Sequence, residues 1–399
     1  MSGGQRDVLV AGVGMVQFRK PSEGFSYDDL GHEAVVSALA DAGVGYETVD
    51  LVYAGYVYGD SCCGQRVVYR SGLTGVPVFN VSNNCSTGST ALFLARQAIA
   101  GGTADCVLAV GFEQMNPGAL GAMYQDRIAP FQAFEDASAA LSSFDGPPAL
   151  RYFGGAGLEH MDRFGTSLAD FASVRAKASR HASRNPLAVF RKELSVEEVL
   201  NDQVLLPGAM TRSMACPPTS GAAAALLVSR EFASRHGLAP AASIVAQAMT
   251  TDGPATFSAG DMINLIGFEM VQRAARQVYE AAGIGPDSIR VCELHDCFAQ
   301  NEVISYEALG LCPVGEASRF IADGDNTYGG GVVTNPSGGL LSKGHPLGAT
   351  GLAQCYELVN QLRGTAGARQ VEGRLHHALQ HNIGLGGACV VTLYKKTES

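Results

Sequence analysis

A single cysteine in a loop rich in small residues is the first feature with reactive chemistry. Cys85 stands in the run VSNNCSTGSTAL, between a segment expected to be a strand (76–81) and one expected to be a helix (89–100). A thiol at a helix N-terminus lies at the positive end of the helix dipole, which favours the thiolate. The position therefore predicts a nucleophile, and the competing interpretation is a buried core cysteine.

A histidine between glycines is the second feature. His345 lies in SKGHPLGATG, just before a segment expected to be a helix (352–362). A neutral imidazole can take the proton of a thiol or hydrogen-bond to a carbonyl oxygen. The competing interpretation is a histidine that caps the following helix.

Two further segments carry groups suited to proton transfer or oxyanion binding. In ELHDCF, His295 and Cys297 are alternate residues after an expected strand (289–294), and they share one face if that strand continues. A local hydrogen bond between His295 and Asp296, with a buried cysteine, is the alternative. In HNIGLGGA (381–388), a glycine-rich turn before the last strand is expected to expose backbone N–H groups.

The elements that must position these groups follow an α/β pattern that occurs twice. Each half reads strand, small-residue loop, helix, strand, with a reactive loop before the helix. The segment 115–210 interrupts the pattern and is predicted to form a cap over the site. A helix expected at 167–182 carries basic residues that fit either a solvated face or a contact for phosphates: Arg175, Lys177, Arg180 and His181. Strands are expected at 7–14, 51–58, 76–81, 105–111, 289–294, 376–380 and 388–394, and helices also at 28–42, 89–100, 269–282 and 352–362.

Composition excludes several classes of protein. The 399 residues carry a net charge of −10, which argues against a nucleic-acid or membrane-surface partner. No apolar run is long enough to span a bilayer. Ten scattered cysteines without paired CxxC motifs predict neither a zinc ribbon nor a disulfide framework. The N-terminus lacks the layout of a signal peptide, so a reducing, cytoplasmic location is expected.

Together these motifs resemble one family, the thiolase domain of the sterol carrier protein 2/SCP-x type within the thiolase superfamily. The resemblance runs from Val8 to Lys395 and rests on six runs: NNCSTGSTAL, ELHDCF, YEALGLCP, GDNTYGG, NPSGGLLSKGHPLGATGLAQC and LQHNIGLGGA. It implies a thiolase fold of two βαβαβαββ halves in a five-layered αβαβα arrangement, with an inserted loop domain. The halves are placed at 1–235 and 236–399, and a homodimer is expected.

The resemblance also implies roles for individual residues. Cys85 takes the acyl group, His345 activates it, and Cys297 exchanges a proton with the acetyl-CoA enolate. His295 helps bind the enolate oxygen, and Asn382 has a supporting place where other thiolases have the cysteine of a Cys-x-Gly motif. The backbone N–H groups of Cys85 and Gly384 form the second oxyanion hole, and Cys389 is expected to pack in the core. Acyl-CoA and free coenzyme A are the expected substrates, with no permanent cofactor and no metal.

Three other functions compete with cleavage of 3-ketoacyl-CoA. The first is a thiolase-like retro-aldolase on steroid side-chain CoA thioesters with a small OB-fold partner protein, a class that lacks the nucleophilic cysteine present here as Cys85. The second is biosynthetic condensation, which is the reverse reaction carried out by the same residues. The third is a non-enzymatic lipid-transfer protein, which is not expected because no sterol-carrier segment follows the last expected strand before Ser399.

Overall fold

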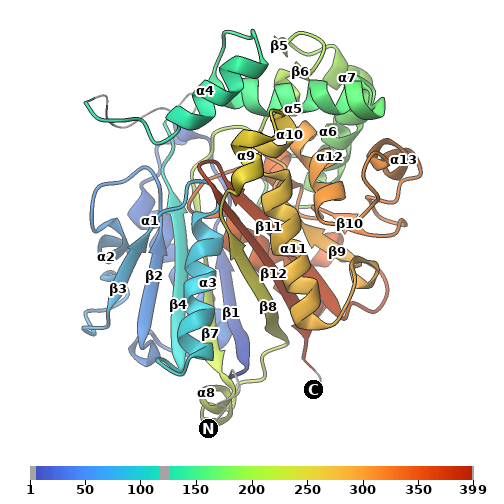
Figure 1. Ribbon diagram of the computed structural model, residues 1–399. Helices are drawn as coiled ribbons and strands as arrows, with labels where there is room; N and C mark the ends of the chain where they lie inside the picture. The colour runs from blue at the N-terminus through green and yellow to red at the C-terminus, as the bar shows by residue number, and fades with distance from the viewer. Residues whose placement is uncertain (1–5, 117–123, 125, 398–399) are drawn as a thin grey trace.

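A mixed sheet of ten strands runs through the computed structural model, which describes residues 6–116, 124 and 126–397 (Figure 1). The strand order is β10-β9-β11-β12-β8-β1-β7-β4-β2-β3, and a separate pair is formed by β5 and β6. The strands are β1 Val8–Met15, β2 Leu51–Gly55, β3 Val78–Val81, β4 Cys106–Glu113, β5 Val204–Leu206, β6 Met210–Thr211, β7 Gly221–Ser229, β8 Ala242–Thr250, β9 Val291–Glu293, β10 Val333–Thr334, β11 His377–Gly384 and β12 Ala388–Lys396.

The sheet consists of two halves with the same strand order. From one edge it reads β3-β2-β4-β7-β1, and from the other β10-β9-β11-β12-β8. Counted along the chain within each half, both orders are third, second, fourth, fifth, first. The halves meet where β1 pairs antiparallel with β8. This repeat confirms the predicted thiolase arrangement, whereas the boundary predicted at 235/236 stays a prediction.

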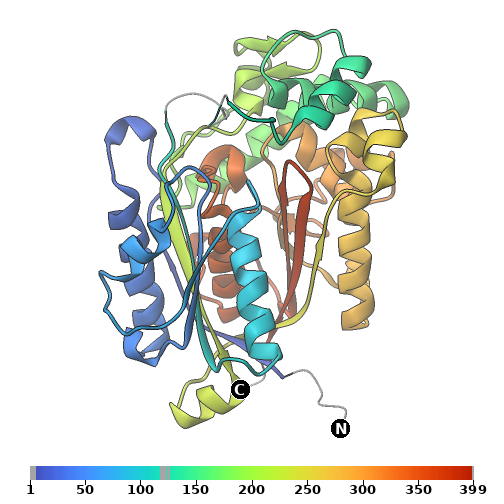
Figure 2. The same cartoon turned by 60° about the vertical axis from the view of Figure 1, so that its left-hand side comes forward.

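Helices form the remaining layers (Figures 1 and 2). α1 covers the outer face of the first half, α11 covers that of the second, and α3 and α14 lie side by side between the halves. The helices are α1 Tyr27–Ala42, α2 Cys63–Val68, α3 Thr87–Ala100, α4 Gln132–Leu141, α5 Pro148–Phe164, α6 Leu168–Ser183, α7 Val196–Leu200, α8 Arg230–Arg235, α9 Pro254–Ser258, α10 Met262–Leu265, α11 Phe268–Ala282, α12 Ala299–Ala308, α13 Ala317–Ala322 and α14 Thr350–Arg363.

The two central helices approach closely because small residues line their contact. A Cβ atom on Gly88 would lie 2.7 Å from the carbonyl oxygen of Gly348, and one on Gly351 would lie 2.1 Å from Ser89 Oγ. Neither position accepts a side chain without displacing its neighbour. Since Cys85 precedes α3 and His345 precedes α14, this close contact brings the two predicted reactive loops together.

Helices α4 to α7 fall within the segment predicted to form a cap and pack over one end of the sheet (Figure 1). α5 and α6 pack against α12 of the second half. Residues 117–123 and 125 of the predicted segment 115–210 lie outside the described residues. The helix expected at 167–182 is α6, and its N-cap Ser167 forms a capping box with Asp170.

For three of the four basic residues on α6, both interpretations, a solvated face and a contact for phosphates, are wrong. Arg175 Nη1 donates to Ser342 Oγ at 2.6 Å, Lys177 pairs with the buried carboxylate of Glu302, and His181 contacts the carbonyl oxygen of Asn335 at 3.0 Å. All three are buried, and only Arg180 is exposed. These three side chains tie the cap to the second half of the sheet, so they are available neither to solvent nor to phosphates.

Two expected boundaries also differ from the structure. β9 ends at Glu293, so the strand does not continue through His295. β11 continues to Gly384, which pairs with Ala388, so most of the glycine-rich turn expected at 381–388 is strand. Among the described residues, no helix has the length and apolar character needed to cross a bilayer. All ten cysteines are free thiols.

Candidate active site

Cys85 occupies a tight turn between β3 and α3. Asn84 adopts a left-handed conformation with φ 49°, and the N–H of Ser86 donates to the Asn83 carbonyl at 3.1 Å. The thiol is 5% exposed and packs against Met115 and Leu347. The turn therefore presents the sulfur to a small apolar enclosure at the helix N-terminus.

The electrostatic setting of Cys85 differs from the sequence-based expectation. Burial, with a smaller effect from the charge of Glu113, raises the pKa of the Cys85 thiol to about 12. The helix N-terminus was expected to favour the thiolate, but desolvation of the charged sulfur outweighs it. Cys85 is therefore a neutral thiol at rest and would need a base to act as a nucleophile.

His345 is placed to be that base. Its backbone N–H donates to Thr219 Oγ1 at 2.6 Å, and its Nδ1 lies 2.7 Å from Thr350 Oγ1. The Thr350 hydroxyl donates its one hydrogen to the Pro346 carbonyl at 2.9 Å, so it must accept from Nδ1–H. Nε2 is then the nitrogen with a free lone pair, and it is buried without a protein partner. Burial lowers the pKa of His345 to about 3, which keeps this lone pair available.

His295 and Cys297 lie in the loop between β9 and α12 instead of on one face of a strand. The chain turns because the Asp296 carboxylate accepts the N–H of Leu340 at 2.7 Å. His295 Nδ1 lies 2.8 Å from Asn382 Nδ2 on β11. Burial, with the nearby Cys216 and Cys85 thiols, holds the pKa of Cys297 well above its usual range.

The loops bring three donor atoms together. One ligand atom each from Cys85, His295 and His345 lies within 4.8 Å of the others. The two imidazole rings stand edge to face, with centroids 5.1 Å apart. This is the one set of histidine, cysteine and acidic side chains, within the described part of the chain, that converges closely enough to hold a metal ion.

Gly384 lies directly against the Cys85 turn. A Cβ atom there would meet the carbonyl oxygen of Asn83 at 2.2 Å and the backbone nitrogen of Ser86 at 3.1 Å. The end of β11 therefore packs backbone to backbone against the Cys85 turn. Cys389 on β12 is fully buried in the core, as predicted.

Three polar residues of the site were missed by the sequence analysis. Thr350 orients His345, as described above. Cys216 lies opposite Cys297, and its N–H donates to the Cys297 carbonyl at 2.9 Å. Glu113 is buried at the end of β4 and accepts backbone N–H groups from Tyr58 and Gly348 at 2.8 and 3.0 Å. Only Glu113 had a sequence signal, as a lone carboxylate ending an otherwise apolar strand.

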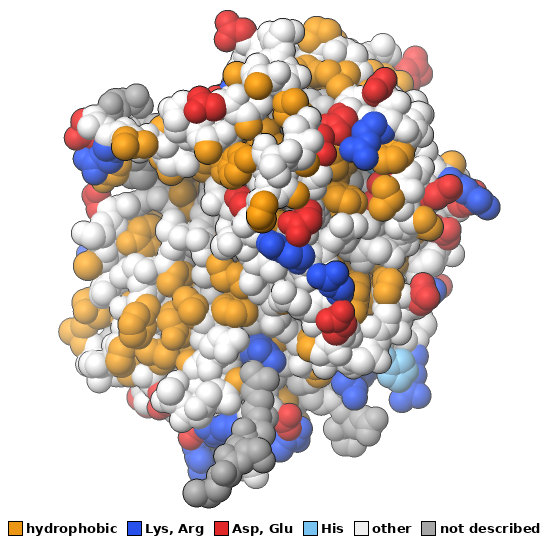
Figure 3. Space-filling view, viewed as in Figure 1, with side chains coloured by type: hydrophobic (Ala, Val, Ile, Leu, Met, Phe, Trp, Pro, Cys, Tyr) orange, Lys and Arg blue, Asp and Glu red, His pale blue; other side chains and the backbone are white. Residues whose placement is uncertain are grey.

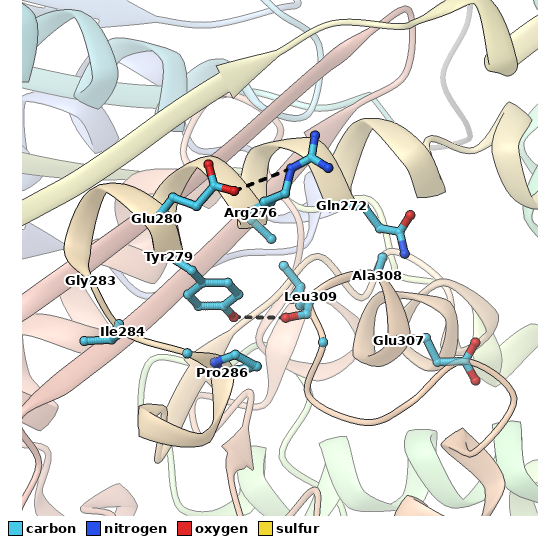
Figure 4. A pocket seen from close by; sticks show the side chains of 13 residues that line it. Gln272, Arg276, Tyr279, Glu280, Gly283, Ile284, Pro286, Glu307, Ala308 and Leu309 are labelled. Carbon is cyan, nitrogen blue, oxygen red and sulfur yellow. Dashed lines mark hydrogen bonds and ion pairs between the residues drawn. The ribbon is translucent and has the colours of Figure 1, made fainter.

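A surface hollow of about 720 Å³ lies away from this site, between α11 and the end of α12 (Figure 4). Its cation Arg276 is paired with Glu280, and Tyr279 donates to the carbonyl of Leu309 at 2.9 Å. None of the predicted site residues lines it.

Comparisons with known proteins identify the family of the chain. The N-terminal thiolase domain model matches residues 8–136, and the thiolase C-terminal domain-like model matches residues 254–394. The chain belongs to the thiolase family. It is 53% identical to sterol carrier protein 2 of Oryctolagus cuniculus over 97% of this chain and 72% of the relative. It is 34% identical to benzoylsuccinyl-CoA thiolase subunit BbsB of Thauera aromatica, over 96% of each.

Solved structures of this thiolase fold extend the likeness. An Ltp2-ChsH2(DUF35) aldolase superposes with a TM-score of 0.83 at 24% identity, over 99% of both chains. Human mitochondrial 3-ketoacyl-CoA thiolase in complex with CoA superposes with a TM-score of 0.73 at 19% identity, over 98% of both chains. At these identities the superpositions establish the fold alone.

Proposed function

We propose that this protein is an acyltransferase that cleaves 3-ketoacyl-CoA with coenzyme A through an acyl thioester on Cys85. The convergence of Cys85, His345 and His295 in one buried site is the observation that carries the proposal. Family membership and a thiolase among the relatives support the reaction class. The CoA complex of a structural neighbour supports coenzyme A as the second substrate.

The first half-reaction moves one proton and one acyl group. His345 Nε2 takes the proton of Cys85, and the thiolate attacks the 3-keto carbon. The C2–C3 bond breaks, and its electron pair passes to the enolate of the departing acyl-CoA. Cys297 gives its proton to C2 of that enolate, while His295 binds the enolate oxygen. The acyl group remains on Cys85.

The second half-reaction restores both proton carriers. The thiol of incoming coenzyme A gives its proton to the Cys297 thiolate and attacks the acyl thioester. The Cys85 thiolate leaves and recovers the proton held by His345. Backbone N–H groups of Cys85 and Gly384 bind the oxyanion in both half-reactions. Splitting one difficult step into two easier ones is the general advantage of covalent catalysis.

Intact-protein mass spectrometry tests this proposal. The protein is incubated with a 3-ketoacyl-CoA but no free coenzyme A, beside Cys85→Ala and the control Cys62→Ala, which removes an exposed thiol. We expect wild type and the control to gain the mass of the shortened acyl group and Cys85→Ala to gain none. If none gains mass while a 3-hydroxyacyl-CoA is cleaved to a carbonyl product, the protein is an aldolase instead.

A second copy of this chain is the partner we propose. β3 is an edge strand of the described sheet, and its neighbourhood exposes the large apolar side chains Tyr69, Leu73 and Phe79. Figure 3 shows apolar side chains gathered over this edge, at the lower left. An edge with unpaired backbone groups and apolar neighbours favours pairing with another strand. The ten free thiols fit a reducing, cytoplasmic location, which we also propose.

A further inference from the structure

A buried hydrogen-bond chain leads from the backbone of α14 to His295. Gln380 Nε2 donates to the Gly351 carbonyl and to Ser89 Oγ, each at 2.8 Å. Ser89 Oγ contacts Asn382 Oδ1 at 2.8 Å, and Asn382 Nδ2 contacts His295 Nδ1 at 2.8 Å. We call Gln380, Ser89 and Asn382 the relay. All three are fully buried.

The direction of every hydrogen bond in the relay follows from its first member. A backbone carbonyl can only accept, so Gly351 fixes the Gln380 amide with its nitrogen toward Ser89. Ser89 then accepts from Gln380, and its one hydrogen goes to Asn382 Oδ1. The Asn382 amide is thereby oriented with its nitrogen toward His295. The opposite end agrees, since the Tyr394 hydroxyl donates to Gln380 Oε1 at 2.5 Å.

The relay has a consequence for the ring of His295. Asn382 Nδ2 is a donor, so His295 Nδ1 must be the unprotonated nitrogen and the proton sits on Nε2. This tautomer is opposite to that of His345, whose Nδ1 carries the proton because Thr350 accepts it. One imidazole therefore presents a lone pair and the other presents an N–H.

We propose that Ser89 and Gln380 are positioning residues that hold His295 as its Nε2–H tautomer, so that it donates a hydrogen bond to the substrate oxygen and cannot act as a second base. The catalytic meaning rests on the proposed thiolase reaction, whereas the tautomer does not. With Nε2 protonated, His295 offers no lone pair to a cation. The Cys85, His295 and His345 cluster then suits acid–base chemistry better than metal binding.

Nuclear magnetic resonance of ¹⁵N-labelled histidine tests the tautomer without any activity assay. The His295 resonances are assigned by their loss in His295→Gln. In the wild-type protein we expect a protonated Nε2 and an unprotonated Nδ1 for His295, and the reverse for His345. A protonated Nδ1 on His295 would overturn the proposal, and the tautomer itself is read in the wild-type protein.

Ser89→Ala tests the relay itself. Without the hydroxyl, Asn382 can rotate its oxygen toward His295, so both tautomers become populated and the two ¹⁵N shifts of His295 move toward each other. Loss of an oxyanion donor costs on the order of 10²–10³ in rate, so a partial loss should lower kcat about 10- to 100-fold with little change in KM. Unchanged His295 shifts in a folded Ser89→Ala protein would refute the role of Ser89.

Thr392→Val is the matched control. It removes a buried hydroxyl from β12 that accepts from Gln247 at 2.8 Å. Thr392 is the cross-strand neighbour of Gln380, but its hydroxyl is hydrogen-bonded to none of Gln380, Ser89 and Asn382, so the control tests the disturbance of this neighbourhood without loss of a relay bond. We expect its His295 shifts and kcat to match those of the wild type. If the shifts respond as predicted but the wild-type protein shows no thiolase activity, the tautomer stands and the proposed function falls.

Discussion

Replacing Gly384 by alanine places a methyl group where the backbone of the Cys85 turn already lies. The added Cβ would stand 2.2 Å from the Asn83 carbonyl oxygen. Non-bonded heavy atoms rest at about 3.5–4.0 Å, so β11 and the turn must separate by more than about 1 Å. The obstacle is backbone on both sides, so no rotamer change relieves it.

The separation should damage catalysis more than folding. A misplacement of about 1 Å can cost roughly 10²-fold in rate, and losing one oxyanion donor costs 10²–10³-fold. Overpacking of a core costs about 1–3 kcal/mol, which a chain of this size can absorb. We therefore expect Gly384→Ala to fold and to form the acyl-Cys85 thioester about 10²-fold more slowly than the wild type.

Rapid-mixing mass spectrometry of the acyl-enzyme measures that rate in a single turnover. Gly285→Ala is the control, because a Cβ atom there meets no atom within 4 Å. Thermal denaturation separates a misplaced oxyanion hole from a failure to fold. A folded Gly384→Ala protein that acylates within about threefold of the wild type would show that the end of β11 has no part in oxyanion binding.

Three further predictions concern the proton carriers and the sheet edge. In His345→Gln, Cys85 has no base, so the rate of its alkylation by iodoacetamide should keep rising as the pH approaches 12. At pH 8 the thiolate fraction is about 10⁻⁴. A plateau of the rate near pH 8 would contradict the conclusion that burial keeps the thiol neutral. Cys297→Ala should still be alkylated at Cys85, but it should no longer exchange solvent deuterium into C2 of acetyl-CoA, as measured by mass spectrometry. Retained exchange would show that another group carries the proton. Leu73→Glu should lower the sedimentation coefficient to that of a monomer, whereas Val314→Glu, which changes another exposed side chain, should not. Equal sedimentation coefficients for the two variants would place the dimer contact elsewhere.

The sequence predicts which loops precede the helices α3 and α14, but not how those loops lie relative to one another. Cys85 and His345 were readable because each sits among small residues at the start of a helix, a local pattern. His295 and Cys297 were assigned to one face of a strand that ends at Glu293. That end is fixed by the Asp296 carboxylate, which reaches the backbone of Leu340, and no local pattern reports such a contact.

Contacts between residues far apart in the sequence explain the other differences between the prediction and the structure. Lys177 looked like a surface cation because its partner Glu302 is 125 positions away, and burial of this pair depends on how the cap packs. Ser89 and Asn382 are separated by 293 positions, so their hydrogen bond was invisible in a single sequence. A motif reports which groups are present, whereas the direction of their hydrogen bonds depends on the packing of α3, α14 and β11.

The reactivity of Cys85 shows why that direction matters. A helix N-terminus favours a thiolate, but the enclosure that packs against Cys85 removes water, and the Glu113 charge works in the same direction, so the resting thiol is neutral. Attack then requires a base with a free lone pair beside the sulfur, which Thr350 secures on His345. In the proposed reaction the oxygen that becomes negative requires a hydrogen-bond donor, and the relay supplies one by holding the proton of His295 on Nε2. Two identical side chains 5.1 Å apart thus receive opposite tautomers from their hydrogen-bond partners. Replacing the donor of Asn382 by an acceptor, or the acceptor of Thr350 by a donor, should give both rings the same tautomer.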